Sequence, residues 1–115
     1  MSTDYSFKEY VEHELLAEVD GISVRRMFDG HGVYRHGIFI ALINEGTLYF
    51  KVDEVTQKDY EREGSKPFVY TGHSGKPVAL SFWEVPASVA DNPQEIQSWA
   101  IAAYDAALRA KKKKK

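Results

Sequence analysis

Apolar side chains recur at every fourth position in the first segment of the chain, with Tyr10 beside them, and they form one stripe. A stripe of this kind is typical of an amphipathic helix that buries one face. We therefore predict a helix at about residues 5 to 19, ended by Asp20-Gly21, with Leu16 off the stripe. The stripe consists of Phe7, Val11, Leu15 and Val19.

Four short segments rich in β-branched and aromatic residues follow, and breaks that contain glycine separate them. Because these connections are short, neighbouring strands must be antiparallel, which predicts a meander. The third segment is apolar on both faces, as expected of a central strand. Asn44-Glu45-Gly46 indicates a three-residue hairpin loop with Gly46 in the left-handed conformation. The segments span residues 24–28, 32–35, 38–43 and 47–52.

The second half of the chain predicts a short helix, two strands and a final helix. The short helix spans about residues 57–63, with Thr56 as its N-cap and Gly64 as its C′ residue. The final helix begins at Asn92-Pro93, because Asn is a preferred cap and Pro is favoured at the first helical position. The strands lie near residues 68–71 and 78–85, and the buried face of the final helix consists of Ile96, Trp99, Ala100, Ala103 and Ala107.

The elements follow the order α-β-β-β-β-α-β-β-α. Strands grouped by hairpins, with helices at the ends, indicate the α+β class. We predict a two-layer α/β sandwich, in which an antiparallel sheet of five to six strands carries helices on one face. A parallel doubly wound fold is disfavoured, since the links between strands are too short for helical crossovers. We expect one domain at residues 1–110 and a disordered lysine tail at residues 111–115.

The charges are distributed unevenly along the chain, with the main basic cluster at the C-terminus. The net charge is −2, but five of the fifteen basic residues form the run Lys111–Lys115. The rest of the chain has ten basic against seventeen acidic residues, a balance of −7. A body this acidic repels a polyanion. We therefore expect contact with nucleic acid only indirectly or weakly, through the lysine run.

Composition also predicts the compartment. The chain has no cysteine, which excludes disulfides, thiol nucleophiles and thiolate metal sites and fits a reducing cytosol. Its longest apolar stretches, residues 38–43 and 78–85, are too short to cross a bilayer. The N-terminus has no apolar region of the kind found in secretory signals. We expect a cytoplasmic protein with no membrane partner.

Patterns for catalysis and metal binding are weak. Asp29, His31 and His36 lack the spacing of a zinc motif, so we expect these histidines to lie in surface turns. The loop at residues 72–77 has a shorter glycine spacing than a P-loop, and Pro77 stands where a P-loop has Ser or Thr. We predict a non-catalytic protein without a metal or an organic cofactor.

Arg25 and Arg26 occupy adjacent strand positions, so one should face inward and the other outward. An inward arginine needs a partner, because an isolated buried charge is costly. Glu14 and Asp53 are the candidate partners for a structural ion pair. The alternative is that the arginines recognise an anion or a protein.

Alternation in the strands at residues 47–52 and 78–85 predicts an exposed aromatic surface. If helices cover the more apolar face of each strand, Tyr49, Lys51 and Trp83 point outward, with Tyr34 near them. Exposed aromatic rings with a few cations are typical of protein-binding surfaces; the alternative is that loops or the first helix hide the rings. The positions expected to face the helices are Leu48, Phe50, Val52, Val78, Leu80 and Phe82. The candidate binding residues are Arg25, Arg26, Tyr34, Tyr49, Lys51, Lys76 and Trp83.

The sequence of residues 25–34, Arg25-Arg26-Met27-Phe28-Asp29-Gly30-His31-Gly32-Val33-Tyr34, resembles the hallmark of the TfoX N-terminal domain family. Similar pieces follow at residues 39–42, 48–53, 67–70 and 75–86, in that family's order and spacing. The resemblance covers about residues 5 to 109, with Asp29 where the family usually has glycine. It implies a two-layer fold like that of secretion chaperones, in a single-domain member. It also implies a role in regulating competence genes together with the cyclic-AMP receptor protein.

Three hypotheses about function follow. The first is a regulatory module that binds a protein partner through the outer sheet face or a sheet edge, with a homodimer as one form of that binding. The second is a transcriptional factor associated with nucleic acid, with the lysine run as an accessory arm. The third is a small-ligand carrier or a minor enzyme, which would need a deep pocket with polar groups in contact.

Overall fold

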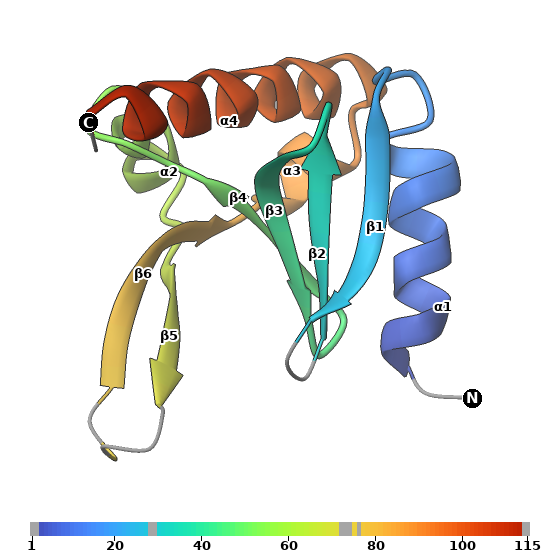
Figure 1. Cartoon of the computed structure of the whole chain (residues 1–115), viewed down its shortest axis with the longest axis horizontal. Helices are drawn as coiled ribbons and strands as arrows, with labels where there is room; N and C mark the ends of the chain where they lie inside the picture. Colours follow the sequence, from blue (N-terminus) through green and yellow to red (C-terminus); the bar gives the residue numbers. More distant parts are fainter. Residues whose placement is uncertain (1–2, 28–29, 72–74, 76, 114–115) are drawn as a thin grey trace.

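The computed structural model describes residues 3–27, 30–71, 75 and 77–113 of the 115-residue chain. It shows a mixed α+β fold (Figure 1), and the order of the main elements follows the sequence prediction. The short helix α3 is additional. The elements are α1 (Thr3–Tyr10), the π-helical turn η1 (Val11–Leu15), β1 (Ile22–Met27), β2 (Gly30–Arg35), β3 (Ile38–Asn44), β4 (Thr47–Lys51), α2 (Gln57–Arg62), β5 (Pro67–Thr71), β6 (Pro77–Glu84), α3 (Ala87–Ala90) and α4 (Pro93–Lys113).

The strands form one antiparallel sheet with the order β1-β2-β3-β4-β6-β5. The first four strands are a meander, as the short connections predicted. Strand β3 lies between β2 and β4, which confirms that it is central and explains why both of its faces are apolar. After α2, the β5–β6 hairpin joins the sheet through β6, which pairs with β4. In Figure 1 this hairpin extends away from α4.

Helix α4 covers the sheet by packing on β3 and β4. The predicted buried face of the helix is confirmed, because its alanines and Ile96 are buried and Trp99 packs against the core. The Asn92 side chain accepts hydrogen bonds from the backbone N–H groups of Gln94 and Glu95, at 3.1 and 3.2 Å, so the predicted cap is confirmed. The fully buried residues of the helix are Ile96, Ala100, Ala103 and Ala106, with Ala107 nearly so.

The first helix differs from its prediction, because it ends at η1 instead of continuing to residue 19. In the π-helical turn the Leu16 N–H donates to the carbonyl of Val11, five residues earlier, at 2.9 Å. This extra residue per turn moves Leu16 onto the buried face below Val11, and its side chain is 1% exposed. The prediction that Leu16 lies off the apolar stripe is therefore wrong.

Two hairpins turn through a pair of residues with positive φ. Asn44 pairs with Thr47, so the β3–β4 loop contains only Glu45 and Gly46, with φ of 49° and 73°. The left-handed Gly46 is confirmed, but the loop is one residue shorter than predicted. Two positive φ angles in succession define a type I′ turn, whose twist matches that of the flanking strands. The β2–β3 turn has the same form at His36-Gly37.

The start of α2 is capped by Asp53 and not by the Thr56 side chain. Thr56 occupies the N-cap position but makes no capping hydrogen bond with its side chain. Oδ1 of Asp53 accepts from the backbone N–H groups of Val55 and Thr56, at 3.0 and 3.2 Å. At the other end, Gly64 has φ of +76° and the Ser65 N–H donates to the Tyr60 carbonyl. This is a Schellman motif, which confirms the predicted C′ glycine.

Helix α4 continues into the lysine run, where the sequence predicted a disordered tail from residue 111. Its last described residue is Lys113. Cationic side chains at a helix C-terminus interact favourably with the helix dipole. None of the helices that the structure describes combines the length and the apolarity needed to span a bilayer.

Candidate binding face of the sheet

Strand register divides the side chains between two faces of the sheet. Residues directly opposite each other in antiparallel strands share a face. Phe50 pairs with Ala41 and Trp83, and all of them pack in or against the core under the helices. Tyr49 and Lys51 alternate with Phe50 and therefore lie on the other face, which we call the outer face.

A β-bulge at Ile40 adds an aromatic ring to the outer face. Val33 pairs with Ala41, but Tyr34 pairs with Phe39, so Ile40 is an extra residue in β3. Ile40 and Ala41 are both fully buried. Strict alternation along β3, with Ile40 present but no bulge, would place Phe39 on the same face as Ala41, two residues further on. The bulge instead places Phe39 beside Tyr34, with the two ring centroids 5.3 Å apart.

Three rings form a contiguous group on the outer face, which we call the outer aromatic cluster. It consists of Tyr34, Phe39 and Phe82. The Phe39 and Phe82 centroids are 4.8 Å apart with their planes tilted by 39°. Phe82 pairs with Lys51 in the neighbouring strand β4, which fixes it on the outer face. Offset and tilted ring pairs at these distances are favourable contacts.

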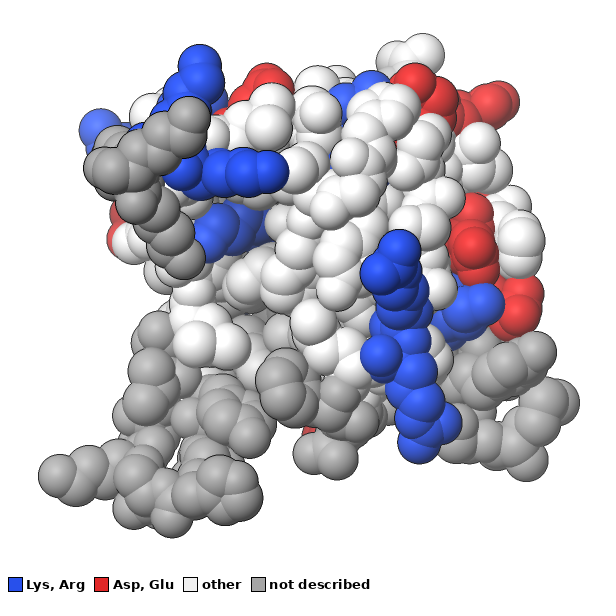
Figure 2. Space-filling view, in the orientation of Figure 1, with Lys and Arg blue, Asp and Glu red and all other residues white. Residues whose placement is uncertain are grey.

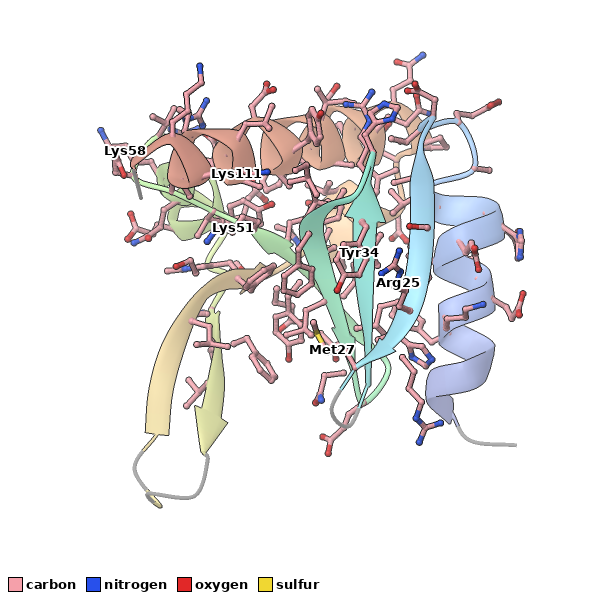
Figure 3. The ribbon with its side chains drawn as sticks, viewed as in Figure 1. Arg25, Met27, Tyr34, Lys51, Lys58 and Lys111 are labelled. Carbon is pink, nitrogen blue, oxygen red and sulfur yellow. The ribbon has the colours of Figure 1, made fainter. Side chains whose placement is uncertain are left out.

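Cationic side chains lie over the faces of these rings. The Arg25 guanidinium is 5.3 Å from the Tyr34 ring centroid, and the Lys51 ammonium is 5.5 Å from that of Phe82. These separations are in the range of cation–π interactions. Figure 3 shows Arg25 and Tyr34 side by side at β1 and β2, with Lys51 on β4. The outer face therefore combines aromatic rings with positive charge.

Below the C-terminal half of α4, the outer aromatic cluster borders a shallow hollow of about 320 Å³. Lys111 lines it from α4 and Lys51 from β4, and Figure 3 shows both on the same side of the molecule. None of the described residues that line it is acidic. The lining residues are Tyr34, Gly37, Ile38, Phe39, Lys51, Phe82, Ala107, Ala110 and Lys111.

The predicted orientation of Trp83 is wrong. Trp83 pairs with Phe50 and packs against the core, so it lies on the face that the helices cover. The prediction assumed that Phe82 and the residues alternating with it face the helices because they are more apolar. The register of β6 on β4 reverses this assignment, since Phe82 pairs with Lys51.

Tyr49 lies on the outer face as predicted, but in a different environment from Tyr34. Its ring packs edge-on against Phe68, with the centroids 4.9 Å apart. It pairs with Glu84, and partial burial, assisted by the Glu84 carboxylate, raises the pKa of the Tyr49 hydroxyl. Because the Glu84 carboxylate lies beside Tyr49, the positive charge of the outer face is concentrated on its other side, where Lys51 and Lys111 lie.

The predicted pairing of Arg25 or Arg26 with Asp53 is wrong. Both arginines are exposed on β1, which is an edge strand. Asp53 instead pairs with Arg109 of α4, which donates from Nε and Nη2 to the two carboxylate oxygens, the second at 3.1 Å. Glu14, the other candidate partner, is exposed on η1.

The hydrogen bond from Arg109 lowers the pKa of the Asp53 carboxyl to about 2, and the Val55 and Thr56 N–H groups act in the same direction. The ion pair joins α4 to the second residue after β4, so it fastens the helix layer to the sheet. Lys76, the remaining candidate binding residue, lies outside the described residues, as does Asp29 of the glycine turn.

Sequence reasoning missed three residues of the site, namely Phe39, Phe82 and Lys111. Phe82 was assigned to the helix-covered face by alternation, which the long-range register overrides. Phe39 lies in a strand that is apolar on both faces, so alternation predicted no face for it. Lys111 was assigned to a disordered tail. The available signal was the uninterrupted helix-forming composition of residues 106–113, since alanine, leucine, arginine and lysine all favour helix.

Among the described residues, one group of side chains has metal-ligating donors close together. Glu9, Glu12 and His13 on α1 and η1 place one donor atom each within 4.8 Å of one another. The Lys8 ammonium lies 2.9 Å from Glu12, and His13 lies 3.1 Å from Glu9. These are the helix-spaced charge pairs expected on an exposed helix face, and they account for the cluster.

A family model described as the TfoX N-terminal domain matches residues 14–107 of the chain, which is most of its length. A search of curated proteins found no match. The family match covers every strand of the sheet and most of α4. It therefore includes the described residues of the outer face and of the hollow except Ala110 and Lys111.

Proposed function

This chain belongs to the TfoX N-terminal domain family, and we propose that it is a cytoplasmic, non-catalytic regulatory module that binds another protein through the outer face of its sheet. The observation that carries this proposal is the outer aromatic cluster with its cations. Helices cover one face of the sheet, and the opposite face presents rings, Arg25 and Lys51.

Composition at this face supports binding of a protein. Tyrosine, phenylalanine and arginine are enriched at protein interfaces, and a few such residues supply most of the binding free energy. Tyr34 and Tyr49 are partly exposed and each is held by a ring or cation contact, so little side-chain entropy is lost when a partner binds. Charge at the edge of the surface would set the association rate and the choice of partner.

The regulatory role proposed here is participation in the control of competence genes, the role that the family resemblance implies. The TfoX N-terminal domain family is not a known enzyme family. The hollow below α4 is open and is lined mainly by apolar and cationic residues. Catalysis by a side-chain pair needs convergent polar groups with matched pKa values. The absence of cysteine fits the proposed compartment.

Affinity capture from a lysate of the source cells, with covalent crosslinking and mass spectrometry, tests the proposal. We expect Arg25→Ala and Tyr49→Ala to lose partners that the wild-type chain captures. Ile101→Ala is the matched control, because Ile101 is an exposed apolar residue on α4. Identical partner sets for wild type and both outer-face variants, with unchanged thermal unfolding, would contradict binding through this face.

A further inference from the structure

The hollow below α4 has an apolar floor and a positively charged rim. We propose that it binds a short acidic segment of the partner protein, in which an aromatic or aliphatic side chain lies between carboxylates. This inference rests on the proposed function and specifies the chemistry of the partner. The apolar side chain would enter the hollow, and the carboxylates would contact Lys51, Lys111 and Arg25.

Charge complementarity is the first argument. Lys51 and Lys111 line the hollow from two different elements, and Arg25 lies beside it over Tyr34. Figure 2 shows basic side chains below α4 and over β1, whereas acidic ones gather over α1. Apart from the lysine run, the chain carries seventeen acidic and ten basic residues. A positive face on an acidic molecule focuses an approaching anionic group onto that face.

The floor of the hollow is suited to an apolar side chain. Phe39 and Phe82 form it from the sheet, and Ala107 and Ala110 border it from α4. Because alanine side chains are short, the helix leaves space above the rings. A partner side chain placed there would be surrounded by apolar atoms, which is the arrangement of a buried anchor residue in a protein interface.

The same rings are poorly arranged for stacking nucleic-acid bases. Base stacking needs an open ring face. Arg25 lies over the Tyr34 ring, Lys51 lies over the Phe82 ring, and Phe82 is only 8% exposed. Phe39 packs between the other two rings with its plane tilted to both. The ring faces are therefore occupied, and a protein segment fits this surface better than a single strand.

A second copy of this chain is a weaker candidate for the occupant. Acidic groups on its α1, η1 and α2 are already engaged, because Lys8 pairs with Glu12, His13 lies against Glu9, and Arg62 pairs with Asp59. Docking these carboxylates on another copy would require those pairs to break. We therefore assign the hollow to a different protein and leave self-association as an outcome of the test.

Selection from a displayed library of random-sequence peptides tests the proposal with the intact chain. We expect selected peptides to contain more Asp and Glu than the library, adjacent to Phe, Leu or Trp. Fluorescence anisotropy of a selected peptide should give a Kd that Lys51→Glu and Lys111→Glu each raise about fivefold or more. Added salt should raise the Kd of the wild-type chain as well.

Lys58→Glu is the matched control, because Lys58 is exposed on α2 and does not line the hollow. It should leave the Kd unchanged. Lys111 is an exposed helix residue, so its variant should unfold at the wild-type temperature even if Lys51→Glu does not.

Several results would overturn the proposal that the hollow binds an acidic segment. In the selection, they are no enrichment at all or enrichment without an excess of acidic residues. In the binding measurements, they are equal effects of Lys51→Glu and Lys58→Glu on the Kd, or tighter binding of a single-stranded oligonucleotide than of the peptide. A concentration-dependent dimer with which the peptide does not compete would also overturn it. If lysate capture still depends on Arg25 and Tyr49 in that case, binding through the outer face stands and only the partner chemistry is wrong.

Discussion

Asp53 connects three parts of the molecule with a single side chain. Its carboxylate caps the start of α2, accepts two hydrogen bonds from Arg109 of α4, and follows directly after the last residues of the sheet core. The side chain is 10% exposed, whereas that of Arg109 is 40% exposed. The negative charge is therefore held in a specific, partly desolvated position, where hydrogen bonds to the ionised form favour it.

We expect Asp53→Asn to lower the free energy of unfolding at neutral pH by about 1–2 kcal/mol, after allowing for solvent screening of Arg109. The folded-state pKa of about 2 lies below the ordinary value of 3.8. The charge therefore stabilises the fold fully above about pH 4, and this contribution is lost as the pH falls towards 2. Urea unfolding at a series of pH values measures the difference between wild type and variant.

The control is Asp20→Asn, which removes an ion pair to Arg35 from an exposed aspartate. Its effect on stability should be smaller, because exposed ion pairs contribute little. A difference between wild type and Asp53→Asn that is as large at pH 2 as at pH 7 would show that the charge of Asp53 is not its source.

Gly30 and Gly32 differ in what surrounds them, although both lie in β2. A Cβ atom at position 30 would overlap the backbone carbonyl of Ile43 in the adjacent strand. At position 32 it would meet side-chain atoms of Phe39 and Tyr34 at 3.2 Å, and these can move. We expect Gly30→Ala to cost about 1–3 kcal/mol of stability and Gly32→Ala clearly less, as measured by thermal unfolding. Equal costs would contradict this reading of β2.

At the scale of elements, most boundaries followed from local signals, because those signals act through neighbouring residues. Asn92 and Gly64 make the capping contacts that their types and positions predicted. Local signals do not show where one extra residue changes the phase of an element. The π-helical turn moves Leu16 to the buried face, and the bulge at Ile40 moves Phe39 to the exposed one. A periodic pattern contains no signal for such a shift.

A stability measurement can distinguish the π-helical turn from a regular α-helix. Leu16 is buried below Val11, whereas Leu15 is only partly buried. Leu16→Ala should therefore lower stability by about 2–5 kcal/mol, the usual cost of truncating a buried leucine. Leu15→Ala should cost clearly less. Chemical denaturation of both variants measures this order, and the reverse order would indicate that the helix is regular through residue 19.

For the whole molecule, the sequence predicted the layers but not which residues share the candidate site. Fold class follows from element order and connection lengths, and both are local properties. The site depends on the register of β6 on β4, which is set by packing between distant segments. Trp83 and Phe82 are adjacent and both aromatic, so nothing in their neighbourhood determines which one faces the helices. The Asp53–Arg109 pair is likewise a contact across the chain.

Removal of the lysine run tests its part in the molecule. The last buried residue of α4 is Ala107, and the run begins after Ala110. We expect a chain ending at residue 110 to unfold at nearly the wild-type temperature. Its retention on a polyanion such as heparin should fall, with a flatter dependence on salt, since fewer cations are left to release counterions. A large loss of thermal stability would show that the run contributes to folding.

The extra residue at position 40 has a consequence for how relatives of this protein can diverge. Loss of that one residue would restore strict alternation and place Phe39 directly before Ala41, so the ring would stay on the outer face while the bend of the bulge disappeared. Loss of Ala41 in place of Ile40 would have the same result, because either residue can fill the single inward position opposite Val33. A one-residue deletion at this point of β3 would therefore leave the aromatic surface in place in such a lineage, whereas the same deletion elsewhere in the strand would exchange its two faces.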